Sequence, residues 1–260
     1  MKVVVAESAE SAARVVADLV ALFITTAPRP VLGLAAGETM EAVYAELVRR
    51  HREEGLGFAA VDAFLLDEYL DLDDDDPCAY RNVAHRMLAG QVDMGPGTVH
   101  GPNAQAIDVT AECVRYEQQV REALIGLQLL GIGANGHLAF NEPGSPWDSV
   151  TRVVALSQRT RADNARFFRA SRFVPSWAIT QGISTILAAA ALVLVACGEH
   201  KAAAVARAVE GPATTGMPAS AIQLHPDVTV VVDSLAGSRL AEVSPSSAHY
   251  MREQDWSFAL

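Results

Sequence analysis

Short apolar runs alternate with segments of helical periodicity along the whole chain. In the first helical segment, apolar side chains recur every three or four positions and form one face, at Ala12, Val15, Val16, Leu19, Val20 and Phe23. Strands are predicted at residues 2–5, 31–34, 61–66, 127–131, 192–196 and 228–232. Further helices are predicted near residues 39–50, 107–123, 160–170, 176–188 and 199–209. This alternation predicts an α/β fold, with a mostly parallel, open, Rossmann-like sheet and helices on both of its faces.

The composition is that of one large domain. Half of the 260 residues are hydrophobic and 20% are charged, which supplies a substantial core and argues against disorder. The sequence contains no internal repeat and no linker rich in Pro, Gly or Ser, so residues 1–260 are predicted to form a single domain. Residues 146–174 differ from the rest because they are polar and only weakly periodic.

The sequence shows no pattern typical of a membrane-spanning or secretory segment. The longest apolar stretch, residues 186–198, is too short to cross a bilayer, and Glu7 comes too early for a secretory signal. Three cysteines without metal-ligand spacing, Cys78, Cys113 and Cys197, are typical of reduced thiols. We therefore expect a cytoplasmic protein that does not bind a membrane.

The charge of the chain limits its partners. A formal net charge of −11 argues against a nucleic-acid partner, which requires a basic face. An anionic small molecule is still compatible, because the local field in a pocket decides its binding. The acidic run of residues 71–76 lacks the interleaved glycine and terminal glutamate of a calcium loop, so a solvated loop without metal is predicted.

The most informative stretch is the glycine-rich run of residues 131–144, which follows an apolar strand. Ligands of open α/β sheets bind beyond the carboxyl ends of the strands, and glycines let the backbone approach a ligand closely. The run contains His137 and Glu142, a pair suited to proton transfer near neutral pH. Taken alone, a glycine turn with a histidine also fits an ordinary strand-to-loop connection.

Two further segments carry possible chemistry. Residues 33–39 join a strand to a helix and include Gly33 and Gly37, an arrangement that directs backbone N–H groups and the positive helix end toward a phosphate. Asp67 follows an apolar strand, where partial desolvation would raise its basicity. Asp67 could instead cap the next helix.

These motifs together resemble the glucosamine-6-phosphate deaminase (isomerase) family. The resemblance extends roughly from residue 31 to residue 233, in the order that the family shows. It rests on Leu66-Asp67-Glu68-Tyr69, the run from Gly131 to Gly144, Arg159-Thr160-Arg161, Asn164-Ala165-Arg166-Phe167-Phe168, Gly198-Glu199-His200-Lys201 and the segment from Pro218 to Pro226.

The resemblance implies a role for each matching residue. Asp67 would be the base that moves a proton between sugar carbons, and His137 would open the sugar ring, with Glu142 and Asn135 beside it. Residues 146–174 would form a lid. The substrate, and above all its phosphate, would be held by Ala36, Gly37, Glu38, Thr39, Gly136, Arg161 and Lys201.

The activity implied is that of a hydrolase-type deaminase which converts glucosamine 6-phosphate into fructose 6-phosphate and ammonia. It requires no metal and no organic cofactor. A homo-oligomer is possible. Three alternatives remain open: galactosamine 6-phosphate as substrate, a hydrolase resembling 6-phosphogluconolactonase, and a non-catalytic sugar-phosphate sensor.

Several positions depart from the family pattern. Ala36, Glu38 and Met40 replace the usual phosphate-loop residues, and Asn135 replaces an aspartate found in many members. A carboxylate facing a phosphate at contact distance costs about 1 kcal/mol in water and more in a pocket. The Glu38 side chain is therefore expected to point to solvent, or the substrate differs at this end.

Overall fold

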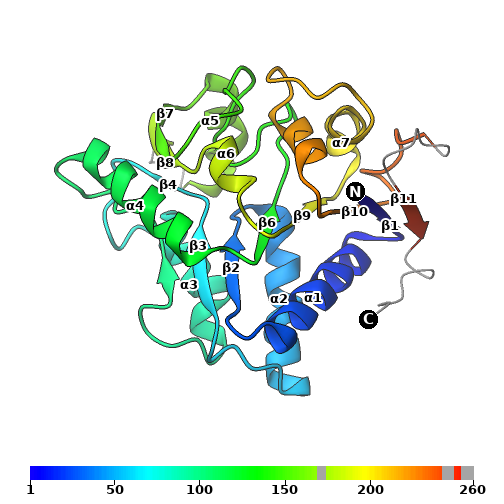
Figure 1. Cartoon of the computed structure of the whole chain (residues 1–260), viewed down its shortest axis with the longest axis horizontal. Helices are drawn as coiled ribbons and strands as arrows, with labels where there is room; N and C mark the ends of the chain where they lie inside the picture. The colour runs from blue at the N-terminus through cyan, green and yellow to red at the C-terminus, as the bar shows by residue number, and fades with distance from the viewer. Residues whose placement is uncertain (169–173, 242–248, 253–260) are drawn as a thin grey trace.

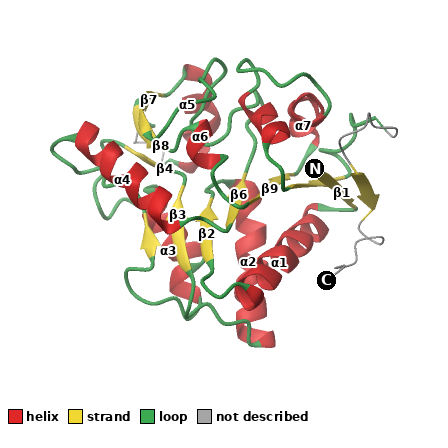
Figure 2. Cartoon of the chain, viewed as in Figure 1, coloured by secondary structure: helices red, strands yellow, loops and turns green. Residues whose placement is uncertain are grey.

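The computed structural model describes residues 1–168, 174–241 and 249–252 of the chain. Its main sheet is eight-stranded, with the order β11-β1-β10-β9-β6-β2-β3-β5, and every neighbouring pair is parallel (Figures 1 and 2). The strands are β1 (Lys2–Ala6), β2 (Val31–Leu34), β3 (Asp62–Leu65), β5 (Val99–His100), β6 (Leu127–Leu130), β9 (Ala191–Ala196), β10 (Val228–Asp233) and β11 (His249–Arg252). The α/β fold class predicted from the sequence is confirmed.

Helices cover both faces of this sheet, as right-handed connections between parallel strands require (Figure 1). One face carries α1 (Ala9–Thr26), α2 (Glu38–Glu54) and α3 (Tyr80–Met87), and the other carries α4 (Val109–Ala123), α6 (Ile183–Ile186) and α7 (Ala202–Val209). No helix in the described ranges is both long and apolar enough to cross a membrane.

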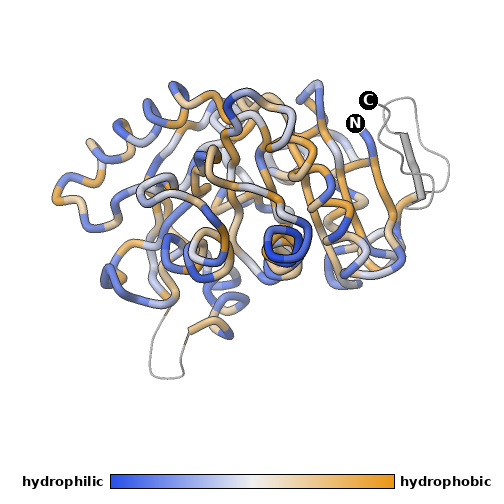
Figure 3. Tube along the Cα trace, turned by 90° about the horizontal axis from the view of Figure 1, so that it is seen from below, coloured by the Kyte–Doolittle hydropathy of each residue, from blue (hydrophilic) through white to orange (hydrophobic). Residues whose placement is uncertain are grey.

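Burial on two faces explains the apolar strands. All six residues of β10 are buried, and its pairing with β1 and β9 places it in the interior of the sheet. Hydrophobic residues accordingly follow the inner strands, while hydrophilic ones collect on outer turns (Figure 3). Ser8 begins α1 by accepting a hydrogen bond from Ser11 N at 3.2 Å, which satisfies one of the free N–H groups of the first turn.

A second, antiparallel sheet lies beyond the carboxyl ends of the main strands and was missed in the sequence. It consists of β4 (Asp67–Tyr69), β8 (Trp177–Thr180) and β7 (Arg152–Ala155), in the order β4-β8-β7. The helix predicted over residues 176–188 is wrong in its first half, because pairing with both neighbours holds 177–180 extended. Only α6 of that helix forms.

The polar segment of residues 146–174 is more ordered than its weak periodicity indicated. It contains β7, α5 (Gln158–Asn164) and the 3₁₀ turn η2 (Ala165–Phe167), while its residues 169–173 lie outside the described part of the chain. A small hydrophobic core, separate from the main one, joins it to the second sheet. This core consists of Tyr69, Leu72, Ala79, Phe140, Leu156, Phe168, Val174 and Ala178.

Gly182 fixes the turn between β8 and α6, and its substitution is expected to destabilise the protein. A Cβ at this position would lie 2.1 Å from the backbone oxygen of Ser149, so the backbone itself would have to move. Gly182→Ala should lower the free energy of unfolding by about 1–3 kcal/mol, as overpacking does elsewhere. Urea unfolding measures the change. Gly57→Ala, whose added Cβ would meet only Asp93 Oδ2 at 3.9 Å, is the control and should leave stability nearly unchanged.

Candidate active site

The candidate site lies where the strand order reverses. From β2 the chain proceeds to β3 and β5 on one side, whereas from β6 it proceeds to β9 and β10 on the other. Such a switch point leaves a crevice at the carboxyl ends of the strands. A cavity of about 550 Å³ opens there. Of the residues predicted from the sequence, it is lined by Ala36, Gly37, Glu38, Thr39, Asp67, His137 and Lys201.

The remaining predicted residues do not line this cavity. They are Asn135, Gly136, Glu142 and Arg161. Arg161 instead donates from Nε to the backbone oxygen of Val174 at 3.3 Å. Its place in the cavity wall is taken by Arg166, five residues further along the chain. The resemblance had marked Arg166 as part of a matching motif, but sequence reasoning chose the earlier arginine.

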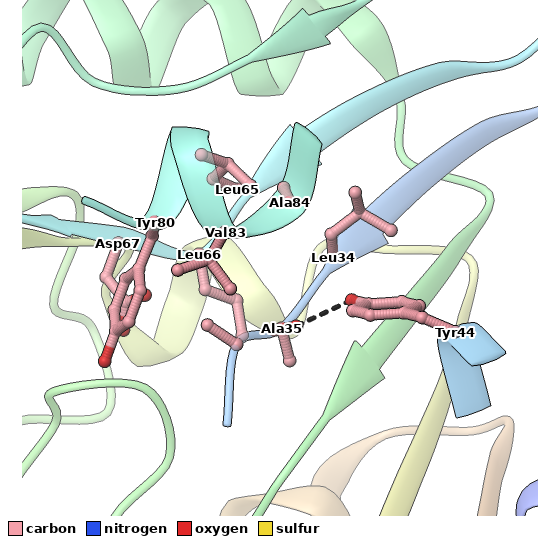
Figure 4. Close-up of a pocket in the computed structure, with 10 residues that line it drawn as sticks. Leu34, Ala35, Tyr44, Leu65, Leu66, Asp67, Tyr80, Val83 and Ala84 are labelled. Carbon is pink, nitrogen blue, oxygen red and sulfur yellow. Dashed lines mark hydrogen bonds between the residues drawn. The ribbon is translucent and has the colours of Figure 1, made fainter. Parts of the chain in front are cut away.

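Asp67 occupies the point at which the chain passes from one sheet to the other. Its side chain is only 6% exposed, and Figure 4 shows it beside the ring of Tyr80, where both residues also line a small pocket of about 10 Å³. Burial, together with the neighbouring carboxylate of Glu68, raises the pKa of Asp67 well above its usual value. The cavity wall therefore contains a carboxyl group whose pKa is elevated.

Glu68 has a structural task that sequence reasoning did not specify. Its buried carboxylate accepts hydrogen bonds from the backbone N–H groups of Tyr69, Tyr80 and Arg81, at 3.0, 2.7 and 2.9 Å. Two of these groups belong to the first turn of α3, whose N-cap residue Ala79 has no side chain that can accept them. Glu68 thereby attaches the start of α3 to the strand that carries Asp67.

His137 owes its position to a neighbouring glycine. A Cβ on Gly133 would lie 2.2 Å from the imidazole Cε1, so the ring occupies the space that a side chain there would fill. Its Nδ1 is buried and has no hydrogen-bond partner among the residues that the structure describes. Burial lowers the pKa of His137, although the charge of Glu142 acts in the opposite direction. A neutral imidazole at pH 7 is the result.

Glu142 lies behind His137 and is held by three side chains. It accepts hydrogen bonds from Asn135 Nδ2 at 2.7 Å, from Ser157 Oγ at 3.0 Å, and from Thr160 Oγ1. Burial raises the pKa of Glu142, but these bonds outweigh it and leave the pKa below the ordinary value. Glu142 is therefore ionised.

Asn135 connects this carboxylate to the histidine loop. Its Oδ1 accepts from His137 N at 3.2 Å, while its amide nitrogen donates to Glu142. Ser157 and Thr160 were not selected from the sequence, although Thr160 stands within the matched motif of residues 159–161. Gly136, with a φ of +87°, provides the turn itself and accepts at its oxygen from Ala219 N at 2.8 Å.

Cationic groups and a helix N-terminus also line the cavity. Gly37 is the N-cap of α2, with a φ of +127°, and places the positive end of this helix at the cavity. Lys201 Nζ donates to Ile132 O at 2.8 Å, and burial, assisted by the charge of Arg166, lowers the pKa of Lys201. Lys201 and Arg166 make this wall suitable for an anion.

The Glu38 side chain is largely exposed and also takes part in an ion pair. Its carboxylate is 2.7 Å from Arg166 Nη2, and both side chains are more than half exposed. Glu38 and Arg166 thus form an ion pair between the α2 N-terminus and the segment of residues 158–167.

This doubly wound α/β fold, with its ionisable groups gathered at the switch point, defines a protein that can bind a small anion beside a basic carboxylate and a neutral imidazole. Residues 5–231 match the family model described as glucosamine-6-phosphate isomerases/6-phosphogluconolactonase, and the chain belongs to this family. The resemblance found in the sequence is thereby confirmed.

Similar proteins cover nearly the whole chain. A glucosamine-6-phosphate deaminase of Beutenbergia cavernae is 45% identical over 98% of this chain and 99% of its own. One of Mycolicibacterium smegmatis is 45% identical over 92% of this chain and 93% of its own.

Solved structures agree with these sequence relatives. A monomeric glucosamine-6-phosphate deaminase superposes with a TM-score of 0.90 at 42% identity, covering 92% of this chain and all of that one. A 6-phosphogluconolactonase from Leishmania guyanensis gives a TM-score of 0.74 at 21% identity, over 92% of this chain and 98% of that one. The second likeness shows a shared fold.

Proposed function

We propose that this protein converts glucosamine 6-phosphate and water into fructose 6-phosphate and ammonia. The observation that carries the proposal is that Asp67, His137 and Lys201 line one cavity. The relatives named as glucosamine-6-phosphate deaminases, at 45% identity over most of the chain, support it. This reaction couples an aldose–ketose isomerisation to the release of ammonia. The terms isomerase and deaminase therefore describe it better than the term hydrolase, which the sequence resemblance had implied.

The two titratable groups fit the two kinds of proton transfer that this reaction requires. A neutral imidazole can accept the proton of the C1 hydroxyl and return it to the ring oxygen, which opens the ring, and His137 is assigned this step. Glu142 and Asn135 hold the loop around it. Asp67, made basic by burial, then removes the proton from C2 and delivers it to C1, while one proton of the C2 amino group passes to O1, so that C1 becomes an alcohol and C2 an imine. Water then adds to the C2 imine, and the C–N bond of the resulting carbinolamine breaks. Ammonia is released, and a ketone remains at C2.

The phosphate is assigned to the cationic wall of the cavity. Lys201 and Arg166 supply positive charge, and the N-terminus of α2 at residues 37–39 supplies backbone N–H groups and the helix dipole. Arg166 replaces Arg161 in this role, because Arg161 is outside the cavity wall. This assignment keeps the reactive end of the sugar near Asp67 and His137.

Residues 146–174 are proposed to act as a lid. The support is that Asn164, Arg166 and Phe167 line the cavity although they belong to a segment with its own small core. Asn164 Nδ2 donates to the hydroxyl of Tyr69 at 2.8 Å, and Arg166 pairs with Glu38 at the start of α2. Opening the segment would break these contacts and expose the site.

The decisive experiment measures ammonia release from glucosamine 6-phosphate and galactosamine 6-phosphate in parallel. We expect ammonia and fructose 6-phosphate from the first substrate. Ammonia from the galacto compound alone would favour that substrate instead. Binding of either sugar phosphate without any ammonia would identify a sensor, and hydrolysis of 6-phosphogluconolactone without deamination would identify a lactonase. The homo-oligomer considered from the sequence stays a prediction, which sedimentation at several concentrations checks.

Neutralising Glu38 is expected to tighten substrate binding. Glu38→Gln removes a negative charge from the phosphate loop and releases Arg166, which its carboxylate now engages. One charge pair near the surface is worth about 1 kcal/mol, so KM for glucosamine 6-phosphate should fall about fivefold while kcat changes little. Steady-state kinetics at low and high salt measure the effect, which salt should diminish. Glu53→Gln at the far end of α2 is the control, and an unchanged KM in both variants would contradict the prediction.

A further inference from the structure

The chain changes sheets immediately before Asp67. β3 ends at Leu65 in the main sheet, and β4 begins at Asp67 in the antiparallel sheet, so that Leu66 alone separates them. Leu66 N still donates to Leu34 O in the main sheet, at 3.2 Å. The carbonyl groups of Leu65 and Leu66 therefore decide the direction in which the Asp67 backbone leaves that sheet.

Both of these carbonyl groups accept a hydrogen bond from Gln181. Its side-chain Nε2 donates to Leu65 O at 2.9 Å, and its backbone N donates to Leu66 O at 2.8 Å. Gln181 directly follows Thr180, which is the partner of Asp67 in the β4–β8 pairing. The side chain of Gln181 is fully buried. Gln181 thus bonds to both peptide groups that precede Asp67, and Leu65 O accepts a second hydrogen bond from the Tyr116 hydroxyl at 2.6 Å.

Asn141 extends this connection to the histidine loop. Its Nδ2 donates to Gln181 O at 2.8 Å and to Leu138 O at 3.1 Å. Leu138 directly follows His137, and Asn141 is also fully buried. Hydrogen bonds therefore run through two buried amides, from the residue after His137 to the two residues before Asp67.

The hydrogen bonding of the two amides is incomplete. Neither Asn141 Oδ1 nor Gln181 Oε1 has a hydrogen-bond partner within the described residues. Burying an amide oxygen without a partner lowers stability, whereas apolar side chains of similar shape would avoid that loss. Asn141 and Gln181 differ from Gln128, whose Oε1 also lacks a partner among the described residues, because their amide nitrogens bond to backbone groups close to His137 and Asp67.

We propose that Asn141 and Gln181 are positioning residues that fix the Asp67 carboxylate relative to the His137 imidazole. The inference rests on the proposed function, since it concerns the two groups assigned to proton transfer. Neither amide lines the cavity, so both act through the backbone groups that they hold. Their loss should change the rate of proton transfer and leave phosphate binding intact.

The test uses two nearly isosteric substitutions in the full chain, Gln181→Met and Asn141→Leu, alone and combined. We expect kcat for ammonia release to fall about 10- to 100-fold in each single variant, because small misplacements of catalytic groups have effects of this size. KM should stay within about threefold of the wild type, and the acidic limb of the kcat–pH profile should move as the surroundings of Asp67 change. The double variant should lose little more than either single variant, because the two amides act as one unit.

Gln128→Met is the matched control. Gln128 is equally buried, its Nε2 donates to Leu129 O at 2.9 Å, and its Oε1 also has no partner among the described residues. Its variant should show a change in thermal stability but no change in kcat or in the pH profile.

The outcomes separate this inference from the proposed function. A wild-type protein that releases no ammonia refutes the proposed function and this inference with it. An active wild type whose Gln181→Met variant keeps its kcat and pH profile refutes the inference alone, as does a loss of kcat no greater than that of Gln128→Met. If one of the two single variants does not accumulate as folded protein, the kcat and pH profile of the other single variant test the inference by the same criteria.

Discussion

Replacing Asp67 with asparagine is expected to lower kcat by about 10²- to 10⁴-fold and to stabilise the fold at neutral pH. The loss of activity follows because an amide cannot accept the C2 proton, a step worth this range in other enzymes. The gain in stability follows because the carboxylate is buried beside Glu68, and burial raises its pKa. Ionisation of the Asp67 carboxyl group is therefore unfavourable in the folded state.

The sign of the pH dependence follows from the direction of that shift. Because the pKa of Asp67 is raised from 3.8, the folded state holds its proton at pH values where the unfolded state has already lost it. Asp67 therefore reduces stability progressively as the pH rises from about 4 toward its folded-state pKa, and the full cost is present above that value. Catalysis runs the opposite way, since the base works only above its folded-state pKa.

Urea unfolding between pH 4 and pH 8 measures this effect. The difference in the free energy of unfolding between Asp67→Asn and the wild type should be smallest at pH 4 and should grow with pH. Asp75→Asn, at an exposed position in the acidic loop, should follow the wild type throughout. Asp67→Asn with wild-type activity, or with a stability gain that does not depend on pH, would contradict the assignment of Asp67 as a buried base.

Gly133→Ala is expected to reduce activity nearly as much as the loss of His137 itself, by about 10²-fold or more. The added methyl group would occupy space 2.2 Å from Cε1 and 2.3 Å from Nδ1 of the imidazole. The ring must then leave its present place, and a general acid–base group must be within hydrogen-bond reach of its substrate atom. The substitution leaves the His137 side chain itself unchanged, so a loss of activity would report on the position of the imidazole alone.

Gly131→Ala is the matched control for this substitution. It lies two residues earlier in the same loop, and an added Cβ there would meet nothing within 4 Å. Steady-state kinetics and the thermal midpoint should be compared for both variants. We expect Gly133→Ala to melt close to the wild type, because the imidazole can swing into the cavity. Equal activity in the two variants would show that the position of His137 is not critical.

Six of the eight strands of the main sheet could be predicted within about two residues, because they are apolar runs buried in the sheet. Residues 31–34 and 228–232 illustrate this, since they agree with β2 and nearly with β10. β5, which has only two half-buried residues, and β11 were not predicted. The second sheet could not be found in this way. β8 is short, and what keeps it extended is pairing with β4 and β7, segments distant in the sequence. Periodicity within one segment carries no record of such partners.

The candidate site could likewise be predicted from the sequence only in part. His137 and Lys201 stand in matching motifs directly after strands, and the structure places both at the cavity. The choice between Arg161 and Arg166 depended on how α5 ends, which the sequence does not define. Likewise, nothing in the sequence indicates that the carboxylate of Glu68, the residue after Asp67, holds the first turn of α3. A hydrogen bond to a backbone group 12 residues away leaves no pattern in the sequence.

The small core around Tyr69, Phe140 and Phe168 has a consequence for how the protein fails on heating. It is separate from the main core, and the strand that bears Asp67 belongs to the sheet above it. Cooperative units of this kind can open below the global transition. On heating, activity can therefore be lost while the eight-stranded sheet is still folded. The temperature at which activity is lost and the melting temperature of the main sheet can then be changed independently by mutation.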